Sequence, residues 1–350
     1  MAGRSLGIRP TQTGRRGNPE IAVSVVIPLY NKEASIARTI ESVLSQEGAP
    51  GFEIVVVDDG STDGGPAVVE SIGDLRIRLV RQKNQGVSAA RNTGVRESRA
   101  DLVAFLDADD QWRPAFLATV RRLARQYPEC GAIGSAYEFV EPDGKRWSPR
   151  HSSIPPAPWE GIIPDYFRAA AKMPPVFTSG VAIRRGVLDE LGGFRVGVRL
   201  GEDLDMWARI ARRYPIAWSS SPLAVYRKDA AARACVQNPA SRREWTLWAS
   251  LALEVNEDEV DEPGGYPGYE EYVYRKLLGQ AVHCMARGKR PDAMACLELA
   301  KPTREYRTRR LLYSALCAMP APLVSLARGL FLRGIPKPRA KSWSWNGKTD

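Results

Sequence analysis

The densest group of carboxylates in the sequence lies in the stretch VAFLDADDQWRP, residues 103–114. Asp107, Asp109 and Asp110 directly follow an apolar run that is typical of a strand buried on both faces. Pro114 indicates that a helix begins next, because proline is favoured in the first helical turn. Two carboxylates about 4 Å apart repel each other by roughly 4 kcal/mol at an effective dielectric constant near 20. Helix amides, arginines or a divalent cation must therefore offset this charge.

The elements that position these carboxylates can be inferred from the pattern of residues 20–128, which alternates strand-like and helix-like segments. This alternation predicts βαβ units, a mostly parallel sheet and right-handed crossovers. In such α/β sheets, ligands bind beyond the carboxyl ends of the strands. Three polar strand ends, at residues 28–31, 58–61 and 107–110, are therefore expected to meet at one site. The expected strands are residues 21–30, 77–82 and 100–107, with a further strand that runs into a turn within residues 52–65. The expected helices are residues 32–46, 86–98 and 114–127.

The pattern changes after residue 128, where strands are joined by longer, proline-rich connections. FTSGVAIRR (177–185) is typical of a buried strand, and GEDLDMWARIARRY (201–214) of an amphipathic helix with acidic residues in its first turn. From about residue 240 only helical patterns remain. We therefore expect a disordered basic arm (1–20), an α/β domain (21–235, with halves 21–128 and 129–235) and a helical C-terminal extension (236–350).

Composition restricts the class of protein. The chain has 350 residues, five cysteines without a CxxC pair and two histidines, which disfavours zinc sites and disulfide frameworks and fits a reducing compartment. The net charge of +10 favours an anionic partner, such as nucleotide phosphates, anionic lipid or nucleic acid. The arginines are scattered, so nucleic acid is not expected. No apolar run reaches the roughly 20 residues of a membrane span, so we expect a protein that is cytoplasmic or peripheral on the inner face of the membrane.

Five motifs occur together in one order: VSVVIPLYNKEASIARTIESVLSQ, EIVVVDDGSTDG, NQGVSAARNTG, FLDADD and GEDLDMWAR. In this order and approximate spacing the chain resembles the family 2 glycosyltransferases over residues 21–228. The resemblance implies the GT-A fold, an α/β architecture, and transfer of a sugar from a nucleotide-sugar. UDP-sugars are the expected donors, and a glycan or lipid-linked glycan the expected acceptor.

The resemblance assigns the donor side of the site. It implies that Asp109 is the direct ligand of a divalent cation, with Asp107 near the ribose or the metal. The expected cations, Mg²⁺ and Mn²⁺, are hard ions that prefer carboxylate oxygens. Asp59 is implied to accept a hydrogen bond from the base, and Arg91 to lie against the acidic cluster. Pro28 and Tyr30 are the expected contacts to the base, whereas Glu33 is equally consistent with a helix-start residue.

The resemblance also assigns the acceptor side. Asp203 is implied to be the general base that deprotonates the acceptor hydroxyl, with Glu202 beside it, and direct displacement would invert the anomeric configuration. Ser179 and Gly180 are expected to line the acceptor pocket, although Gly180 is also consistent with close packing. Asp205 is expected to serve structure.

One departure from the family pattern is the absence of a histidine after LAVYRK, where many relatives place one near the diphosphate. Arg227 or Lys228 is the candidate substitute. The apolar segment 307–335 is consistent with a helix docked on the catalytic domain or with one lying on an anionic membrane surface.

Two other functions remain open. A sugar-1-phosphate nucleotidyltransferase would need a glycine-rich phosphate loop after the first strand, and PLYNKEAS provides none. A catalytically silent nucleotide-sugar-binding or scaffold protein would be free to lose Asp107, Asp109 and Asp203, and the sequence retains all three.

Overall fold

The computed structural model describes residues 21–49, 51–151, 153–198, 201–228, 251, 268–286, 289–300 and 311–315. The expected arm (1–20) and most of the apolar segment 307–335 lie outside these residues, so the predictions made for them stay predictions. No helix in the described ranges is long and apolar enough to cross a membrane.

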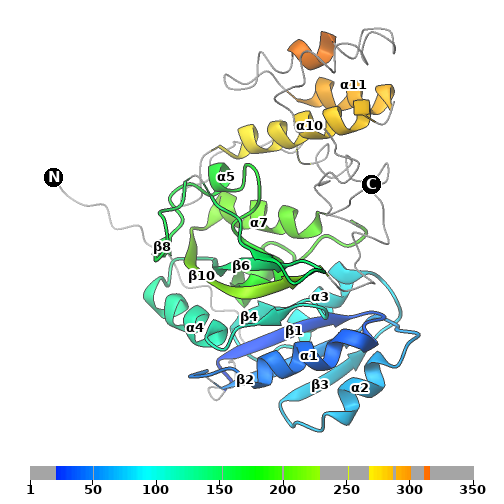
Figure 1. Ribbon diagram of the computed structural model, residues 1–350, viewed down its shortest axis with the longest axis vertical. Coiled ribbons are helices and arrows are strands. Elements are labelled where there is room, and N and C mark those ends of the chain that lie inside the picture. Colours follow the sequence, from blue (N-terminus) through cyan, green and yellow to red (C-terminus); the bar gives the residue numbers. More distant parts are fainter. Residues whose placement is uncertain are drawn as a thin grey trace, which may run out of the picture.

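The first half of the sheet is parallel, as expected (Figure 1). Its strands lie in the order β3-β2-β1-β4. Every neighbouring pair in this half is parallel, so the carboxyl ends of the strands share one edge. The elements are β1 (Val23–Leu29), α1 (Glu33–Leu44), β2 (Phe52–Asp58), α2 (Gly65–Ser71), β3 (Ile77–Arg81), α3 (Val87–Glu97) and β4 (Leu102–Phe105).

Beyond β4 the sheet becomes mixed, which the sequence pattern did not predict. The order continues β4-β9-β6-β10-β5. β9 is antiparallel to both β4 and β6, whereas β10 is parallel to β6. The elements here are β5 (Gln111–Trp112), β6 (Ala132–Val140), β7 (Arg146–Trp147), β8 (Glu160–Ile162), β9 (Val181–Arg184) and β10 (Ile216–Arg227).

Two expected boundaries differ from the structure. Pro114 lies just outside the helix, because Ala115 is the N-cap of α4 (Phe116–Gln126), and the unexpected short strand β5 precedes Pro114. β5 pairs antiparallel with β10, and its buried Trp112 stacks on Phe116 with ring centroids 4.2 Å apart. In the segment 177–185 the strand covers only β9, and a 3₁₀ turn, Thr178–Gly180, precedes it.

Helices cover both faces of the sheet, and alternate residues of β1 enter different cores. Val25 and Ile27 pack with α1 and α4, whereas Val26 packs on the face of α3 and α7. The remaining helices are α5 (Tyr166–Ala169), α6 (Arg185–Glu190), α7 (Glu202–Arg213), α10 (Tyr269–Ala286) and α11 (Arg290–Leu299).

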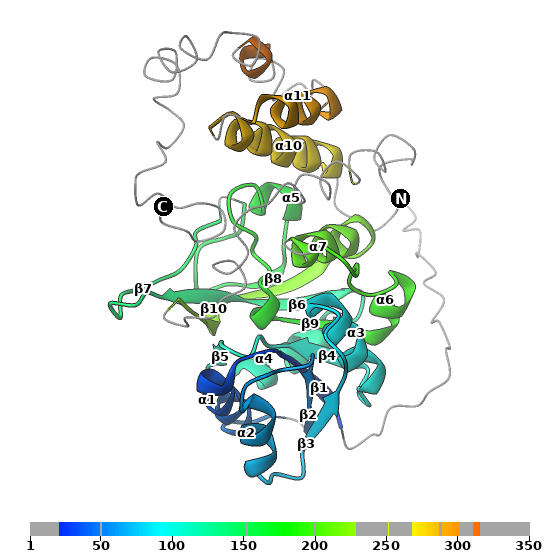
Figure 2. The ribbon, with the colours of Figure 1, turned by 90° about the vertical axis from the view of Figure 1, so that its right-hand side faces the viewer.

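The described part of the C-terminal extension is helical and packs on the α/β domain (Figure 2). The Tyr272 ring of α10 lies 5.3 Å from the Phe167 ring of α5. The Arg212 guanidinium of α7 lies 4.6 Å from the centre of the Tyr269 ring. α10 therefore covers α5 and α7 and belongs to the same hydrophobic core.

Candidate active site

The acidic loop after β4 is hydrogen-bonded to the 3₁₀ turn Thr178–Gly180, which precedes β9. The Asp107 backbone N–H donates to Ser179 Oγ (3.1 Å), and this hydroxyl donates to Asp110 Oδ2 (2.6 Å). The backbone N–H of Arg227, at the end of β10, donates to Asp110 Oδ1 (3.2 Å). Burial, with Asp109 and Asp107 close by, raises the pKa of Asp110 well above its ordinary value. Asp110 is thus the anchored member of the cluster.

Helix α1 holds the other side of the same loop. Thr39 Oγ1 donates to the carbonyls of Ala108 (3.0 Å) and Asp110 (2.8 Å), and Ser35 Oγ also donates to Ala108 (2.9 Å). Just before the helix, Lys32 Nζ lies 2.5 Å from Asp109 Oδ2. Burial raises the pKa of Asp109, and Lys32 opposes this shift. The Asp109 carboxylate therefore already contacts one cation.

Arg91 connects the two acidic motifs of the sequence. Its guanidinium is only 3% exposed and donates from Nη2 to Asp107 Oδ1 (2.8 Å) and from Nη1 to Glu202 Oε1 (2.9 Å). Arg91 lies on α3, whereas Glu202 begins α7. The expected contact of Arg91 with the acidic cluster is thus present, and the loop after β4 and the start of α7 share one buried cation.

Carboxyl groups at the start of α7 titrate above their ordinary range. Burial and the neighbouring Asp203 raise the pKa of Glu202 to about 7, although Arg91 opposes the shift. Burial also raises the pKa of Asp203, opposed by Arg91 and by the Leu204 backbone N–H. Asp205, in contrast, is fully buried and pairs with Arg209 (2.8 Å) and Arg195 (3.3 Å), which fits its expected structural role.

The acidic pair after β2 has different partners. Asp59 Oδ1 accepts from the Gln82 side chain (2.7 Å) and the Gln85 backbone N–H (2.9 Å), and Oδ2 accepts from the Gly86 N–H (2.8 Å). Asp58 Oδ1 accepts from the Ser61 N–H (2.9 Å). Asp59 therefore fixes the loop that leads into α3, and its contact with a base stays a prediction.

The other expected donor residues lie around the end of β1. Tyr30 is exposed, at 44%, and Pro28 is partly buried. The Glu33 carboxylate accepts from the Gly64 N–H (2.9 Å), and its own N–H donates to Asp63 Oδ2 (2.9 Å). These bonds tie the start of α1, where Glu33 is the first residue, to the start of α2, and a contact of Glu33 with the donor stays a prediction.

The two residues expected on the acceptor side are buried under the acidic loop. Ser179 is fully buried, and its hydroxyl is engaged between Asp107 and Asp110. A Cβ at Gly180 would lie 3.4 Å from Ala224 Cβ and from the Ser135 carbonyl, so this glycine permits close packing. The structure places both residues beneath the site, and their contact with an acceptor stays a prediction.

Several residues of the site escaped sequence reasoning. Lys32 was one, although its position just after the first strand could have indicated that it lies near the acidic strand ends. Lys276 of α10 was another: burial and Arg275 lower its pKa to about 7, with Asp203 opposing. No local pattern connects α10 with α7.

The two candidate substitutes for the missing histidine have other partners. Lys228 pairs with Glu141 (2.7 Å), and the backbone N–H of Arg227 donates to Asp110.

The residues present fit a hard divalent cation that completes its shell with ligand and water oxygens. Within the described ranges, no group of three or more His, Cys, Asp or Glu side chains could by itself hold a metal. Asp109 and Asp107 offer carboxylate oxygens at one strand end, and the Lys32 ammonium stands where a cation would be attracted. This donor set suits Mg²⁺ or Mn²⁺.

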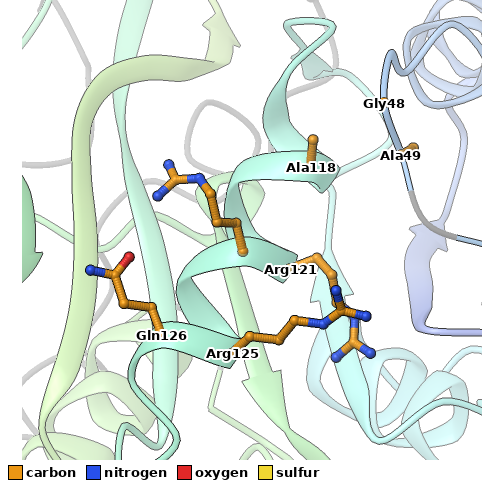
Figure 3. Close-up of a pocket in the computed structure, with 7 residues that line it drawn as sticks. Gly48, Ala49, Ala118, Arg121, Arg125 and Gln126 are labelled. Atoms are coloured by element: carbon orange, nitrogen blue, oxygen red, sulfur yellow. The ribbon is translucent and has the colours of Figure 1, made fainter.

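A pocket of about 600 Å³ lies elsewhere, along α4 and the loop after α1 (Figure 3). None of the predicted site residues lines it, so it is separate from the candidate active site. Its lining is small and basic: Gly48, Ala49, Ala118, Arg121, Arg122, Arg125 and Gln126.

Comparisons with known proteins agree with this geometry. Streptococcus pneumoniae glycosyltransferase GlyA is 34% identical over 124 residues, which are 35% of this chain but only 18% of GlyA. S. aureus TarS, solved with UDP-GlcNAc, superposes with a TM-score of 0.66 at 16% identity, over 89% of this chain and 93% of the TarS chain. The mannosyltransferase PcManGT from Pyrobaculum calidifontis, solved with GDP-Man and Mn²⁺, gives a TM-score of 0.54 at 22% identity, over 94% and 85%.

These likenesses establish the GT-A architecture of the fold. The family model described as Glycosyl transferase family 2 matches residues 24–192, from β1 through the acidic loop to the end of α6. The chain therefore belongs to glycosyltransferase family 2.

Proposed function

We propose that this chain transfers a sugar from a nucleoside-diphosphate sugar, with a UDP-sugar as the expected donor, to a hydroxyl of a glycan or lipid-linked glycan. The observation that supports this most strongly is the position of Arg91 between Asp107 and Glu202. A single buried cation there joins the expected metal-binding loop to the helix that carries the expected base. A site for donor phosphates and a site for acceptor activation would thus be adjacent.

On the donor side, Asp109 would hold Mg²⁺ or Mn²⁺, with Asp107 beside it. When bound, such a cation neutralises charge on the diphosphate leaving group. PcManGT binds GDP-Man and Mn²⁺, which supports a metal, and TarS binds UDP-GlcNAc, which supports a UDP-sugar. Tyr30 is exposed enough to pack on the base, and Pro28, Asp59 and Glu33 are proposed to complete that side.

On the acceptor side, Asp203 would take the proton of the attacking hydroxyl. A raised pKa suits this task, because a general base works best when its pKa is near the operating pH. Arg91 holds Glu202 beside it, which fixes the start of α7 relative to the acidic loop. Attack from the face opposite the leaving group would invert the anomeric centre. Ser179 and Gly180 would support the acceptor pocket from below.

The test is calorimetric titration of UDP, GDP and dTDP, with and without Mn²⁺, into the wild type, Asp109→Ala and Asp143→Ala. Asp143 is an exposed turn residue outside the site and serves as the matched control. We expect one nucleotide to bind only with Mn²⁺, and Asp109→Ala alone to abolish this binding. Binding of no nucleotide, or binding that is indifferent to Mn²⁺ and to Asp109, would reject the proposal.

A second measurement separates an enzyme from a silent binding protein. Asp203→Asn should keep metal-dependent nucleotide binding and lose release of nucleotide from the donor in the presence of acceptor. Wild-type protein that binds a nucleotide-sugar but never turns it over with any acceptor glycan would favour the silent protein instead.

A further inference from the structure

The proposed function gives Lys32 no role, yet Lys32 contacts Asp109, the expected metal ligand. Its Nζ lies 2.5 Å from Asp109 Oδ2, and the two side chains are only 15% and 14% exposed. Asp109 is the carboxylate assigned to the divalent cation. An ammonium and a divalent cation repel each other, so both cannot bind the same carboxylate oxygen.

The backbone on both sides of this ion pair is fixed. Ser35 and Thr39 of α1 donate to the carbonyl of Ala108, and Thr39 also donates to the carbonyl of Asp110. These bonds clamp the acidic loop against the start of α1, where Lys32 is located. When the charge at Asp109 changes, the loop cannot retreat. The long, flexible lysine side chain is the part that can move.

Arg91, the other cation of the cluster, cannot move away from its carboxylates in the same way. Arg91 is 3% exposed, is held by Asp107 and Glu202, and lies 5.3 Å from the centre of the Phe194 ring. Moving it would leave two buried carboxylates without their partner. The Lys32 side chain has a flexible four-carbon stem, so its ammonium can leave Asp109 Oδ2 and remain beside the acidic loop.

We propose that Lys32 is an exchangeable counter-ion, which pairs with Asp109 in the ligand-free protein and contacts the donor diphosphate once a divalent cation takes Asp109. This inference rests on the proposed function. In the ligand-free protein the Lys32 ammonium balances the negative charge of this carboxylate through direct contact. A charge-assisted hydrogen bond from the ammonium to a phosphate oxygen then replaces the bond that is lost.

The experiment compares wild type with Lys32→Met and Lys32→Gln, which remove the charge, and with Lys32→Arg, which keeps it. Lys145→Met, on the exposed β6–β7 turn, is the matched control. Two affinities are measured: Mn²⁺ alone, from the electron paramagnetic resonance of free Mn²⁺, and the wild type's preferred nucleoside diphosphate at saturating Mn²⁺, by calorimetry. Thermal unfolding confirms that each variant is folded.

The two affinities should change in opposite directions. Loss of the competing ammonium should tighten Mn²⁺ binding about fivefold. Loss of one charge-assisted bond should weaken nucleotide binding about tenfold or more. Lys32→Arg should lie between these variants and wild type, and Lys145→Met should match wild type. Equal loss of both affinities, or change in neither, overturns the inference alone. Wild type that binds no nucleotide with Mn²⁺ overturns the proposed function as well.

Discussion

Two acidic strand ends flank β1 in this sheet, one after β2 and one after β4, and they are held in different ways. After β2, Asp58 and Asp59 accept hydrogen bonds from backbone N–H groups and one glutamine side chain. After β4, Asp107 and Asp109 face the side-chain cations Arg91 and Lys32. Both ends have a similar sequence pattern, an apolar strand that ends in aspartates: two after β2 and three after β4.

The difference shows which pair can respond to a ligand charge. Backbone amides are fixed dipoles that shape a loop, so the pair after β2 is part of the framework. Side-chain cations come from separate elements, α1 and α3, and they balance charge that the fold has gathered at one point. The pair after β4 is therefore a charge centre, and the following predictions test this contrast.

The largest effect is expected for Arg91→Met. Removing one partner of a buried ion pair typically costs about 3–5 kcal/mol, because a buried charge is left without compensation. Here Asp107 and Glu202 both lose their partner. Urea unfolding should show a loss in this range. Arg81→Met, which breaks the exposed pair with Glu70, should cost less than about 1 kcal/mol. Similar losses for both variants would contradict the charge-centre interpretation.

The sequence allowed some of this charge centre to be predicted, and the limit has a physical reason. The strands, the acidic helix start and the convergence of strand ends follow from local patterns, so β1, β2, β4 and α7 were expected. The family resemblance placed Arg91 against the acids. Lys32–Asp109 and Ser179–Asp110 join residues far apart in the chain, and only the folded sheet brings them together. The strand β9 was expected, but its antiparallel direction was not, because short apolar strands carry no signal of direction.

The second prediction concerns the pH dependence of stability. Glu202 has a pKa raised from 4.5 to about 7, so between these values the native state binds more protons than the unfolded state. The free energy of unfolding should therefore fall as pH rises through this window, by up to about 3 kcal/mol, and level off above it. Glu202→Gln should remove this dependence, measured by urea unfolding from pH 5 to 8.

The control for this series is Glu97→Gln, an exposed carboxylate outside the cluster. It should keep the pH dependence of the wild type. Because Glu202 and Asp203 titrate together, Asp203→Asn should shift the midpoint of the wild-type curve to lower pH by removing a neighbouring negative charge. A wild-type curve that rises between pH 5 and 8 relative to Glu202→Gln would contradict the assignment.

The smallest effect is expected for Asp59→Asn in the framework pair. The asparagine amide would face a backbone N–H that now donates to a carboxylate oxygen, and one such unpaired buried group costs about 1–3 kcal/mol. Asp143→Asn changes an exposed aspartate that accepts from the Lys145 N–H, and it should lower the free energy of unfolding by much less than Asp59→Asn does. Affinity for Mn²⁺ alone should match wild type in both variants, because Asp59 does not contact the loop after β4. A changed Mn²⁺ affinity in Asp59→Asn would show that the two acidic strand ends act as one charge centre after all.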